Sequence, residues 1–593
     1  MQSLNINDMR ATAGGRSKFF FRYFLLFALL IFCIFQFNIY NIYGFSIYPD
    51  EFGYWASAAE VLGYDWSATV ALGSYYSYGY GMILTGLLWI FHDSVMAYRA
   101  AIAVNMLLQC GSIVILWKIF KRLHQTDGSK KRKMQVVLAV GVAVFYPPWL
   151  FCVEMTMAEA LLMFLYVLIC YQIILFVEKP NIIGAVLLAL SLIYIYFVHM
   201  RTIAVVIAAV LTFFLYAWKT PSVRKKLAIL FVIMVVGVVW GQWIKGKVTA
   251  TVYAATDSEL LSVNDYSGRL GALKNLFSIQ GIKEIFFSSV GKLYYLVMAS
   301  FGLFIPAIYT CVKNIWKMLQ SFCLKKENKE CNGYIYLFCF LAMMGQFVII
   351  AISTMFPGRL DIIIYGRYNE YLLPVFIGIG LITVCENSHK LRIFILNVVI
   401  SAILFMITFR YALHSGLTIM LGFFAPGISY LSNDWNYDIK TEFLKAYFFG
   451  IFLMTCVMIC IYIGKRFRKY IYVMGAILIM EIMLAFCLKG KYTKPFNDKN
   501  YYNLMISQYM AEYDKPISYL YGGGYTFIDL IQFDMRDRKI NIIMEKDLES
   551  QQEGILPDQG FLIVDQECEY LEEIEARYKK CIETQSFILF LAK

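Results

Sequence analysis

Apolar runs of about 20 residues recur along the whole chain and contain few charges, and this is the length that an α-helix needs to cross a membrane. Hydrophobic residues make up 60% of the 593 residues and charged residues 16%, whereas soluble domains are roughly 45–50% apolar and 25% charged. A single water-soluble core of this length would not use so many apolar side chains. The pattern therefore predicts a polytopic α-helical membrane protein and excludes a soluble enzyme, a disordered chain and a protein with one anchor.

The runs predict about thirteen membrane-spanning helices. The first lies near residues 19–47. It follows a basic segment without a small-residue cleavage site, so we expect a retained span rather than a signal peptide. The others lie near residues 95–117, 135–152, 156–177, 181–198, 203–218, 227–244, 286–312, 333–353, 371–385, 393–409, 446–464 and 470–488.

Lys and Arg gather in alternate predicted loops, at residues 118–133, 219–226, 313–329 and 465–469. Basic loops remain on the cytoplasmic side of a membrane. The alternation predicts a multi-pass protein of the plasma membrane whose residues 1–18 form a cytoplasmic N-terminal segment. It also accounts for most of the net charge of +12 without a nucleic-acid partner.

An odd number of spans places the C-terminus outside the cell, where residues 490–593 are expected to form a small extracytoplasmic α/β domain. Residues 19–489 would form the transmembrane domain, with a first outer loop at residues 48–92. The C-terminal segment has strand-like runs at Ile517–Tyr521, Ile540–Met544, Phe561–Val564 and Phe587–Leu591, helical runs near Tyr525–Phe533 and Leu571–Cys581, and a Gly522-Gly523-Gly524 turn. Cys568 and Cys581 either pair or remain free thiols.

Two adjacent carboxylates follow the first span, in Tyr48-Pro49-Asp50-Glu51. Proline and acidic residues are both favoured at the start of a helix, so we expect a short interfacial helix from Asp50 to about Val61. Carboxylates at the point where a span leaves the membrane are costly unless they are solvated, paired or used in chemistry. A solvated helix cap is the alternative to a functional pair.

Further polar residues lie at the predicted outer ends of later spans. They are Glu154, Glu159, His199, Arg201, Asp265, Arg269, Arg359, Asp361, Arg367, Tyr368 and Glu370. Taken singly, each is a snorkelling side chain or a local ion pair. Together on one membrane face they indicate a site, because Arg binds two oxygens of a phosphate and a nearby carboxylate activates an acceptor.

The first outer loop resembles that of the GT-C superfamily of membrane glycosyltransferases, which use polyprenyl-phosphate-linked sugars. Its motifs look like the first-loop signature of the aminoarabinose-transferring and protein O-mannosyltransferase-like branches. The matching motifs are Tyr48-Pro49-Asp50-Glu51 with Tyr54-Trp55-Ala56, then Gly63-Tyr64-Asp65-Trp66, Tyr75-Tyr76-Ser77-Tyr78-Gly79-Tyr80 and, before a later span, Gly366-Arg367-Tyr368. The many spans and the outer C-terminal domain extend the resemblance over nearly the whole chain.

The resemblance implies transfer of a sugar from a polyprenyl-phosphate-linked donor to a lipid, glycan or protein acceptor at the outer face, usually with inversion. Asp50 would be the base, and Glu51 would support it or orient the sugar. The lipid-linked phosphate would be held by Arg201, Arg359 and Arg367, with His199 and Tyr368 as hydrogen-bonding helpers. Glu154 and Glu159 would contact the acceptor or orient Asp50.

No nucleotide-binding fingerprint is present, because the glycines at 522–524 lack the GxGxxG spacing. Some superfamily members hold a divalent metal ion beside the acidic motif and others do not. The sequence offers no His-containing ligand set, so we assign no metal ligands. Asp50 and Glu51 mark the place where such an ion would bind.

Three other classes of protein share parts of the pattern. A transporter or lipid flippase also has many spans and buried charges, but no internal inverted repeat is evident here. A surface-polysaccharide polymerase or ligase also takes lipid-linked sugars, and the loop at Arg410–Glu442, with His414, Asp434 and Trp435, would serve it. A receptor without chemistry would use the outer charges as solvated helix ends. The early acidic pair favours the transferase.

Overall fold

The computed structural model describes the chain except for residues 1–5, 48, 125–128, 259, 260, 262–275, 277, 324–331, 421, 423, 424, 426, 432–437, 524–527, 549–554 and 593. Of residues 6–18 the helical backbone is described. Asp265 and Arg269 of the predicted outer face, Asp434 and Trp435 of the late loop, and Tyr48 of the acidic motif lie outside the described residues.

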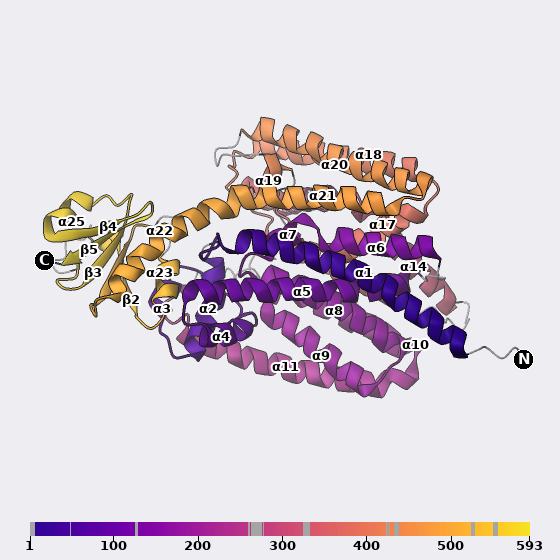
Figure 1. Ribbon diagram of the computed structural model, residues 1–593, viewed down its shortest axis with the longest axis horizontal. Helices are drawn as coiled ribbons and strands as arrows, with labels where there is room; N and C mark the ends of the chain where they lie inside the picture. Colours follow the sequence, from indigo (N-terminus) through magenta and orange to yellow (C-terminus); the bar gives the residue numbers. More distant parts are fainter. Residues whose placement is uncertain are drawn as a thin grey trace, which may run out of the picture.

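A bundle of long helices forms most of the molecule, and a small sheet domain caps one end of it, far from the N-terminus (Figure 1). The helices up to the middle of the chain are α1 (Ile6–Ile39), α2 (Asp50–Val61), α3 (Ser67–Val70), α4 (Gly81–Ile90), α5 (Ser94–Leu123), α6 (Lys130–Val144), α7 (Pro147–Cys152), α8 (Ala158–Glu178), α9 (Ile182–Val198), α10 (Ile203–Lys219) and α11 (Arg224–Thr251). The later ones are α13 (Ile279–Ala299), α14 (Phe304–Cys323), α15 (Asn332–Ser353), α16 (Arg367–Glu370), α17 (Leu373–Glu386), α18 (Lys390–His414), α19 (Ile428–Leu431), α20 (Ile439–Phe467), α21 (Tyr470–Leu488) and α22 (Lys494–Ala511).

The helices confirm a polytopic membrane protein. Within the described residues, nine helices are long and apolar enough to cross a membrane, or up to eleven if each of two bent helix pairs is one span. The shorter α6 and α9 correspond to the remaining two predicted spans. The first predicted span, at residues 19–47, extends too far toward the C-terminus, because α1 ends at Ile39 and the chain turns at Asn41.

The predicted span at 286–312 is two helices, α13 and α14, which meet at 103°. Between them Phe301 and Gly302 have positive φ angles of 53° and 76°, a conformation that glycine adopts without strain. The Gly302 N–H donates to the Val297 carbonyl at 2.8 Å and so closes the end of α13. The apolar pattern runs through this break, and therefore the hydropathy predicted one straight span.

The C-terminal domain contains one five-stranded sheet in the order β2-β1-β3-β5-β4. Its elements are β1 (Ile517–Tyr521), α23 (Asp529–Asp534), β2 (Ile540–Met544), α24 (Glu545–Leu548), β3 (Phe561–Asp565), α25 (Leu571–Arg577), β4 (Tyr578–Glu583) and β5 (Phe587–Ala592). Strands β2, β1 and β3 are parallel, with Ile517 opposite both Ile540 and Phe561, whereas β5 is antiparallel to β3 and to β4.

One prediction for this domain was wrong, because the helical run at Leu571–Cys581 ends at Arg577 and continues as strand β4. Pairing with the buried β5 holds Tyr578–Glu583 extended, and this long-range contact overrides the local helical pattern. Cys568 and Cys581 are free thiols, and the Cys568 Sγ donates to Glu545 Oε1 at 3.1 Å.

The last span continues directly into the C-terminal domain. Helix α21 passes through a π-helical turn at Lys489–Thr493 into α22. The predicted boundary between the two domains, at residue 490, therefore lies inside one continuous helix. The domain then returns through α23 to the loop at residues 48–92, where the Phe533 ring lies 4.8 Å from that of Trp55 on α2. Trp66 Nε1 also donates to the Arg536 carbonyl at 2.8 Å. The C-terminal domain therefore packs directly on the loop that carries the acidic pair.

Candidate functional site

Helix α2 begins at Asp50 and ends at Val61, as the sequence predicts. The Asp50 side chain is 22% exposed. Its Oδ1 accepts a hydrogen bond of 2.6 Å from the Tyr76 hydroxyl, and its Oδ2 lies 2.6 Å from Arg367 Nη1. Burial, together with the Asp50 carboxylate, raises the pKa of Tyr76 well above its usual value, so the phenol stays protonated and donates.

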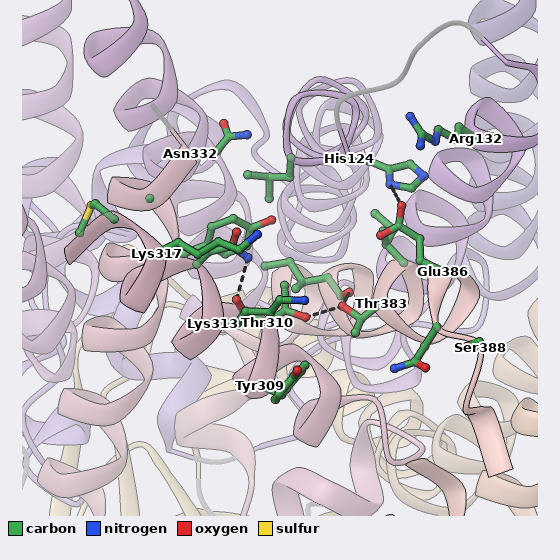
Figure 2. Close-up of a pocket in the computed structure, with 18 residues that line it drawn as sticks. His124, Arg132, Tyr309, Thr310, Lys313, Lys317, Asn332, Thr383, Glu386 and Ser388 are labelled. Atoms are coloured by element: carbon green, nitrogen blue, oxygen red, sulfur yellow. Dashed lines mark hydrogen bonds and ion pairs between the residues drawn. The ribbon is translucent and has the colours of Figure 1, made fainter. Parts of the chain in front are cut away.

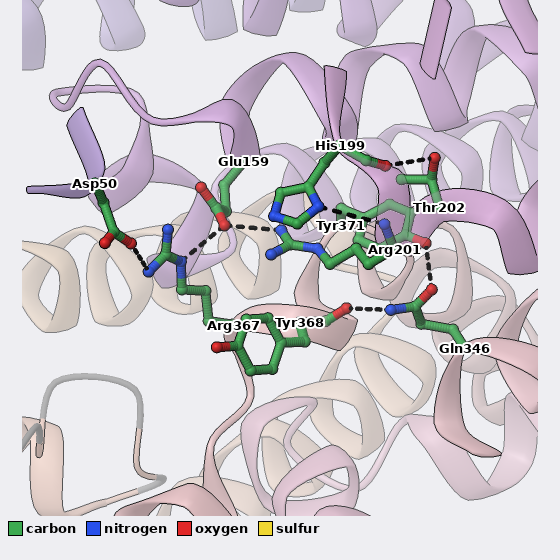
Figure 3. Close-up of polar contacts among 9 residues, drawn as sticks. All are labelled: Asp50, Glu159, His199, Arg201, Thr202, Gln346, Arg367, Tyr368 and Tyr371. Carbon is green, nitrogen blue, oxygen red and sulfur yellow. Dashed lines mark hydrogen bonds and ion pairs between the residues drawn. The ribbon is translucent and has the colours of Figure 1, made fainter. Parts of the chain in front are cut away.

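The ion pair of Asp50 and Arg367 continues inward as a chain of alternating charges (Figure 3). Glu159 Oε1 lies 2.8 Å from Arg367 Nε and 2.8 Å from Arg201 Nη2. The chain therefore joins the start of α2, the start of α16, the first turn of α8 and the 3₁₀ turn Met200–Thr202. We call Asp50, Arg367, Glu159 and Arg201 the charge chain.

Exposure falls along the charge chain from its outer end to its inner end. The Arg367 side chain is 8% exposed, and those of Glu159 and Arg201 are 0% exposed. Two guanidinium groups and two carboxylates compensate one another, which is the condition for keeping charges out of water. Removing one partner from such a buried pair costs about 3–5 kcal/mol. The chain is thus a preorganised polar site whose entrance is Asp50.

A second set of side chains holds the chain in place. The Arg201 guanidinium lies over the Tyr368 ring, 5.1 Å from its centroid. The Arg201 backbone N–H donates to His199 Nδ1 at 3.3 Å. Gln346 Nε2 donates to the Tyr368 carbonyl at 3.1 Å, and the Tyr371 hydroxyl donates to Gln346 Oε1 at 2.9 Å. Of the predicted residues, the structure thus brings Asp50, Glu159, Arg201, Arg367, His199 and Tyr368 together.

Glu51 takes no part in the charge chain, although it follows Asp50 directly. It is fully buried and accepts five hydrogen bonds. The donors are Ser46 N (2.7 Å), Ile47 N (2.9 Å), Tyr98 Oη (2.5 Å), Thr156 N (2.7 Å) and Thr156 Oγ1 (2.9 Å). Glu51 therefore ties α2 to the segment between α1 and α2, to α5 and to the loop before α8.

Arg359 and Glu154 also lie apart from the charge chain. Arg359 Nη2 is 3.2 Å from Asp361 Oδ2, next to the 3₁₀ helix Leu360–Ile364. Glu154 Oε1 is 2.5 Å from Lys489 Nζ, and both Glu154 oxygens accept from Asn38 Nδ2. Arg359 thus has a partner two residues away, whereas Glu154 forms a buried ion pair that joins the end of α7 to the turn after α21.

Sequence reasoning gave no role to Tyr76, Gln346 or Tyr371. Tyr76 belongs to the Tyr-rich stretch of the first outer loop, so its motif was visible, but its contact with Asp50 depends on how the loop folds back over α2. Gln346 lies within the apolar helix α15, where a buried amide signals a polar partner. Nothing in the local sequence identifies that partner.

The surroundings of the acidic pair do not favour a metal ion. Within the described residues, no three side chains of His, Cys, Asp or Glu are grouped as metal ligands. Hydrogen-bond donors surround Glu51, whereas an ion needs convergent oxygen acceptors. The Asp50 oxygens face Tyr76 and Arg367. The two carboxylates of the motif therefore do not form a shared ligand set.

The helical bundle, the acidic helix after the first span and the C-terminal sheet domain define a polytopic membrane protein with a GT-C-like fold. The particular structures that it resembles include two of ArnT from Cupriavidus metallidurans, one bound to undecaprenyl phosphate and one in the apo state. Their sequence identities to the chain are 11% and 12%, and each alignment covers 95% of this chain and 97% of ArnT with a TM-score of 0.52.

The archaeal oligosaccharyltransferase AglB from Archaeoglobus fulgidus, in complex with an inhibitory peptide and a dolichol-phosphate, is also similar. It has 10% identity, and the alignment covers 95% of this chain and 73% of AglB with a TM-score of 0.46. In comparisons of sequence alone, no family model and no curated protein matches the chain.

Proposed function

We propose that the protein is an integral membrane glycosyltransferase that transfers a sugar from a polyprenyl-phosphate-linked donor to a cell-envelope acceptor, with inversion at the anomeric carbon. The charge chain carries this proposal, because it places a partly exposed carboxylate, Asp50, beside Arg367 at one end of a GT-C-like bundle, with Arg201 linked to Arg367 through Glu159. Undecaprenyl phosphate bound to the similar ArnT supports the choice of donor.

Asp50 is the base in this proposal. A hydroxyl of the acceptor attacks the anomeric carbon of the donor sugar, and the bond between that carbon and the phosphate oxygen breaks. The hydroxyl proton passes to the Asp50 carboxylate, and the polyprenyl phosphate leaves with the bonding electrons. Asp50 suits this role because its oxygens lie at the accessible end of the charge chain, within reach of a bound acceptor.

Arg367 holds the donor phosphate, and the fully buried Arg201 supports Arg367 through Glu159, with His199 and Tyr368 beside Arg201. Arg367 has the fork geometry that binds two phosphate oxygens, but in this structure its Nη1 is used by Asp50. A phosphate that binds Arg367 competes for this nitrogen and weakens its ion pair with Asp50. Donor binding would therefore release Asp50 Oδ2 to accept the hydroxyl proton of the acceptor.

We place the charge chain at the outer face of the membrane and the N-terminus in the cytoplasm. Lys130–Lys133 at the start of α6 and Lys465 and Arg466 at the end of α20 lie at the end of the bundle that also holds the N-terminus (Figure 1). Basic residues remain on the cytoplasmic side. An impermeant thiol reagent should label Glu512→Cys in intact cells and Lys225→Cys after permeabilisation, against the background of the unsubstituted chain. The opposite result would invert the orientation.

The decisive experiment compares Asp50→Asn with Asp65→Asn in cells that lack the chain. Asp65 is a matched control because it lies in the same loop, with a 53% exposed side chain paired to Lys539 at the surface. Asp50→Asn should lower the transfer rate at least about 100-fold, the usual contribution of a general base. Mass spectrometry would then show accumulation of the lipid-linked sugar, as in cells without the chain. Full restoration by Asp50→Asn would refute the proposal.

A further inference from the structure

A second polar cavity lies at the end of the bundle opposite the charge chain. It has a volume of about 590 Å³, is partly open, and is lined by the ends of α5, α6, α15 and α17 and by the middle of α14. These ends meet near the N-terminal end of the molecule, whereas α2 lies beside the C-terminal domain (Figure 1). The cavity therefore does not belong to the proposed catalytic site.

Cationic side chains enter this cavity from two sides (Figure 2). Lys313 and Lys317 stand one turn apart on α14, so their side chains lie on one face of the helix. Arg132, near the start of α6, lies across the cavity from them. The ion pairs formed among the described residues do not include Lys313 or Lys317, and the Lys313 ammonium lies 5.9 Å from the centre of the Tyr309 ring.

The carboxylate in the lining is already engaged. Glu386 Oε1 lies 3.1 Å from His124 Nδ1, and the other ring nitrogen of His124 lies 3.1 Å from Gln135 Oε1. Glu386 therefore faces His124 rather than the two lysines across the cavity. The rest of the polar lining is neutral and includes Thr310, Asn314, Asn332, Thr383, Asn387 and Ser388. Thr310 and Thr383 share a hydrogen bond of 2.7 Å, and Asn314 and Asn332 donate to backbone carbonyls.

We propose that this cavity binds a phosphate-bearing anion at the cytoplasmic end of the bundle. Its volume is within the usual range of small-molecule sites, and three cationic side chains face one carboxylate that already has a partner. Basic pockets between membrane helices suit the phosphate of an anionic lipid headgroup. A soluble phosphate compound would meet the same lysines, amides and hydroxyls. The shared chemistry is thus a phosphate held by Lys313 and Lys317.

Native mass spectrometry of the full chain, purified in detergent, tests the proposal. Phosphatidylglycerol and phosphatidylcholine are titrated separately, and inorganic pyrophosphate is the soluble probe. The variant is Lys313→Gln with Lys317→Gln. The matched control is Lys225→Gln with Lys469→Gln, which removes two exposed charges at the same end of the bundle but outside the cavity. Unchanged thermal midpoints show that both double variants are folded.

The cavity variant should bind phosphatidylglycerol or pyrophosphate about tenfold or more weakly, because each basic side chain contributes substantially to holding an anion. The control should bind as the original chain does. Tight binding of phosphatidylglycerol alone would identify a lipid headgroup as the ligand, and binding of pyrophosphate would identify a soluble one. The proposal is overturned if both variants lose binding equally, or if phosphatidylcholine binds as well as phosphatidylglycerol.

Discussion

The two sides of helix α2 use neighbouring carboxylates in opposite ways. On one side Asp50 is partly exposed and belongs to the charge chain, where its partners are a phenol and a guanidinium. On the other side Glu51 is fully buried and accepts hydrogen bonds from three separate segments. Consecutive residues of an α-helix point about 100° apart, so adjacent positions reach different surroundings.

In the proposed mechanism the two residues of the acidic motif have different tasks. The base proposed at Asp50 has to be accessible to the acceptor, whereas Glu51 is buried. Glu51 fixes the helix: it binds Thr156, and Trp55 Nε1 donates to Thr156 Oγ1 at 3.1 Å. We call the Asp50 side of α2 the reactive side and the Glu51 side the anchoring side.

The largest effect is expected from Arg367→Lys on the reactive side. Lysine keeps the positive charge but has no planar fork, so it cannot bind Asp50 and Glu159 together or hold two phosphate oxygens. Losing a preorganised donor to a developing anion typically lowers the rate about 10²–10³-fold. Transfer would be measured in membranes at saturating donor. Arg359→Lys, at a local pair with Asp361, is the control, and equal losses in both variants would remove Arg367 from the site.

Glu51→Gln should act through stability on the anchoring side. The amide NH₂ of Gln is a hydrogen-bond donor, and in this position it would face the N–H and O–H groups that now donate to Glu51. Each buried polar group left without a partner costs about 1–3 kcal/mol. We expect a lower thermal midpoint in detergent and a parallel loss of transfer. Asp50→Asn, by contrast, should lose transfer while its midpoint stays close to that of the original chain. If Glu51→Gln is as stable as Asp50→Asn, the two sides do not differ as proposed.

The sequence predicted the position of α2 better than it predicted the contacts of Asp50 and Glu51. The start of α2 was predictable, because proline and acidic residues mark a helix start and the apolar spans fix its place in the chain. The meeting of Asp50, Glu159, Arg201 and Arg367 was expected only as a shared membrane face. Which residues pair depends on the packing of helices that are far apart in sequence. For the same reason the sequence did not predict the hydrogen bonds that hold Glu51 apart from the charge chain, and it gave Tyr76 no role.

The spans and the sheet show the same limit. Hydropathy locates apolar segments, and so the thirteen predicted spans all correspond to helices. It does not locate a bend such as that at Gly302, because both arms are apolar. In the sheet domain, β4 was predicted as the end of a helix, since its pairing with β5 lies outside any local pattern. Long-range contacts therefore account for most of the errors.

A smaller effect is expected where the C-terminal domain supports the anchoring side. Phe533 packs between Phe45, Trp55 and Trp66, at ring distances of 5.1, 4.8 and 6.1 Å. Phe533→Ala leaves a cavity under α2, and loss of a buried Phe costs about 3–5 kcal/mol. We expect transfer to fall several-fold, with faster hydrogen exchange in peptides from α2. Phe590→Ala, in the core of the sheet, is the control. It should loosen the sheet without changing exchange in α2.

The smallest effect tests how far the anchoring side extends into the sheet domain. Asp565 ends β3, and its carboxylate accepts from the Tyr519 hydroxyl at 2.8 and 3.0 Å. Burial raises the pKa of Asp565 to about 7. The unfolded chain has an ordinary carboxyl pKa of about 3.9. Between these values the folded domain holds a proton that the unfolded chain has lost. The free energy of unfolding of the domain therefore falls as pH rises from about 4 to about 7, and it levels off above that.

Hydrogen exchange at pH 5 and pH 8, corrected for the intrinsic rate, would measure this change in peptides from β1 and β3. Asp565→Asn should reduce the difference between the two pH values, because the amide does not titrate. Peptides from α2 should respond less than those from the sheet, since α23 rather than β3 contacts α2. An equal response in α2 would mean that the sheet and the anchoring side unfold as one unit. An unchanged pH difference in Asp565→Asn would show that another group causes it.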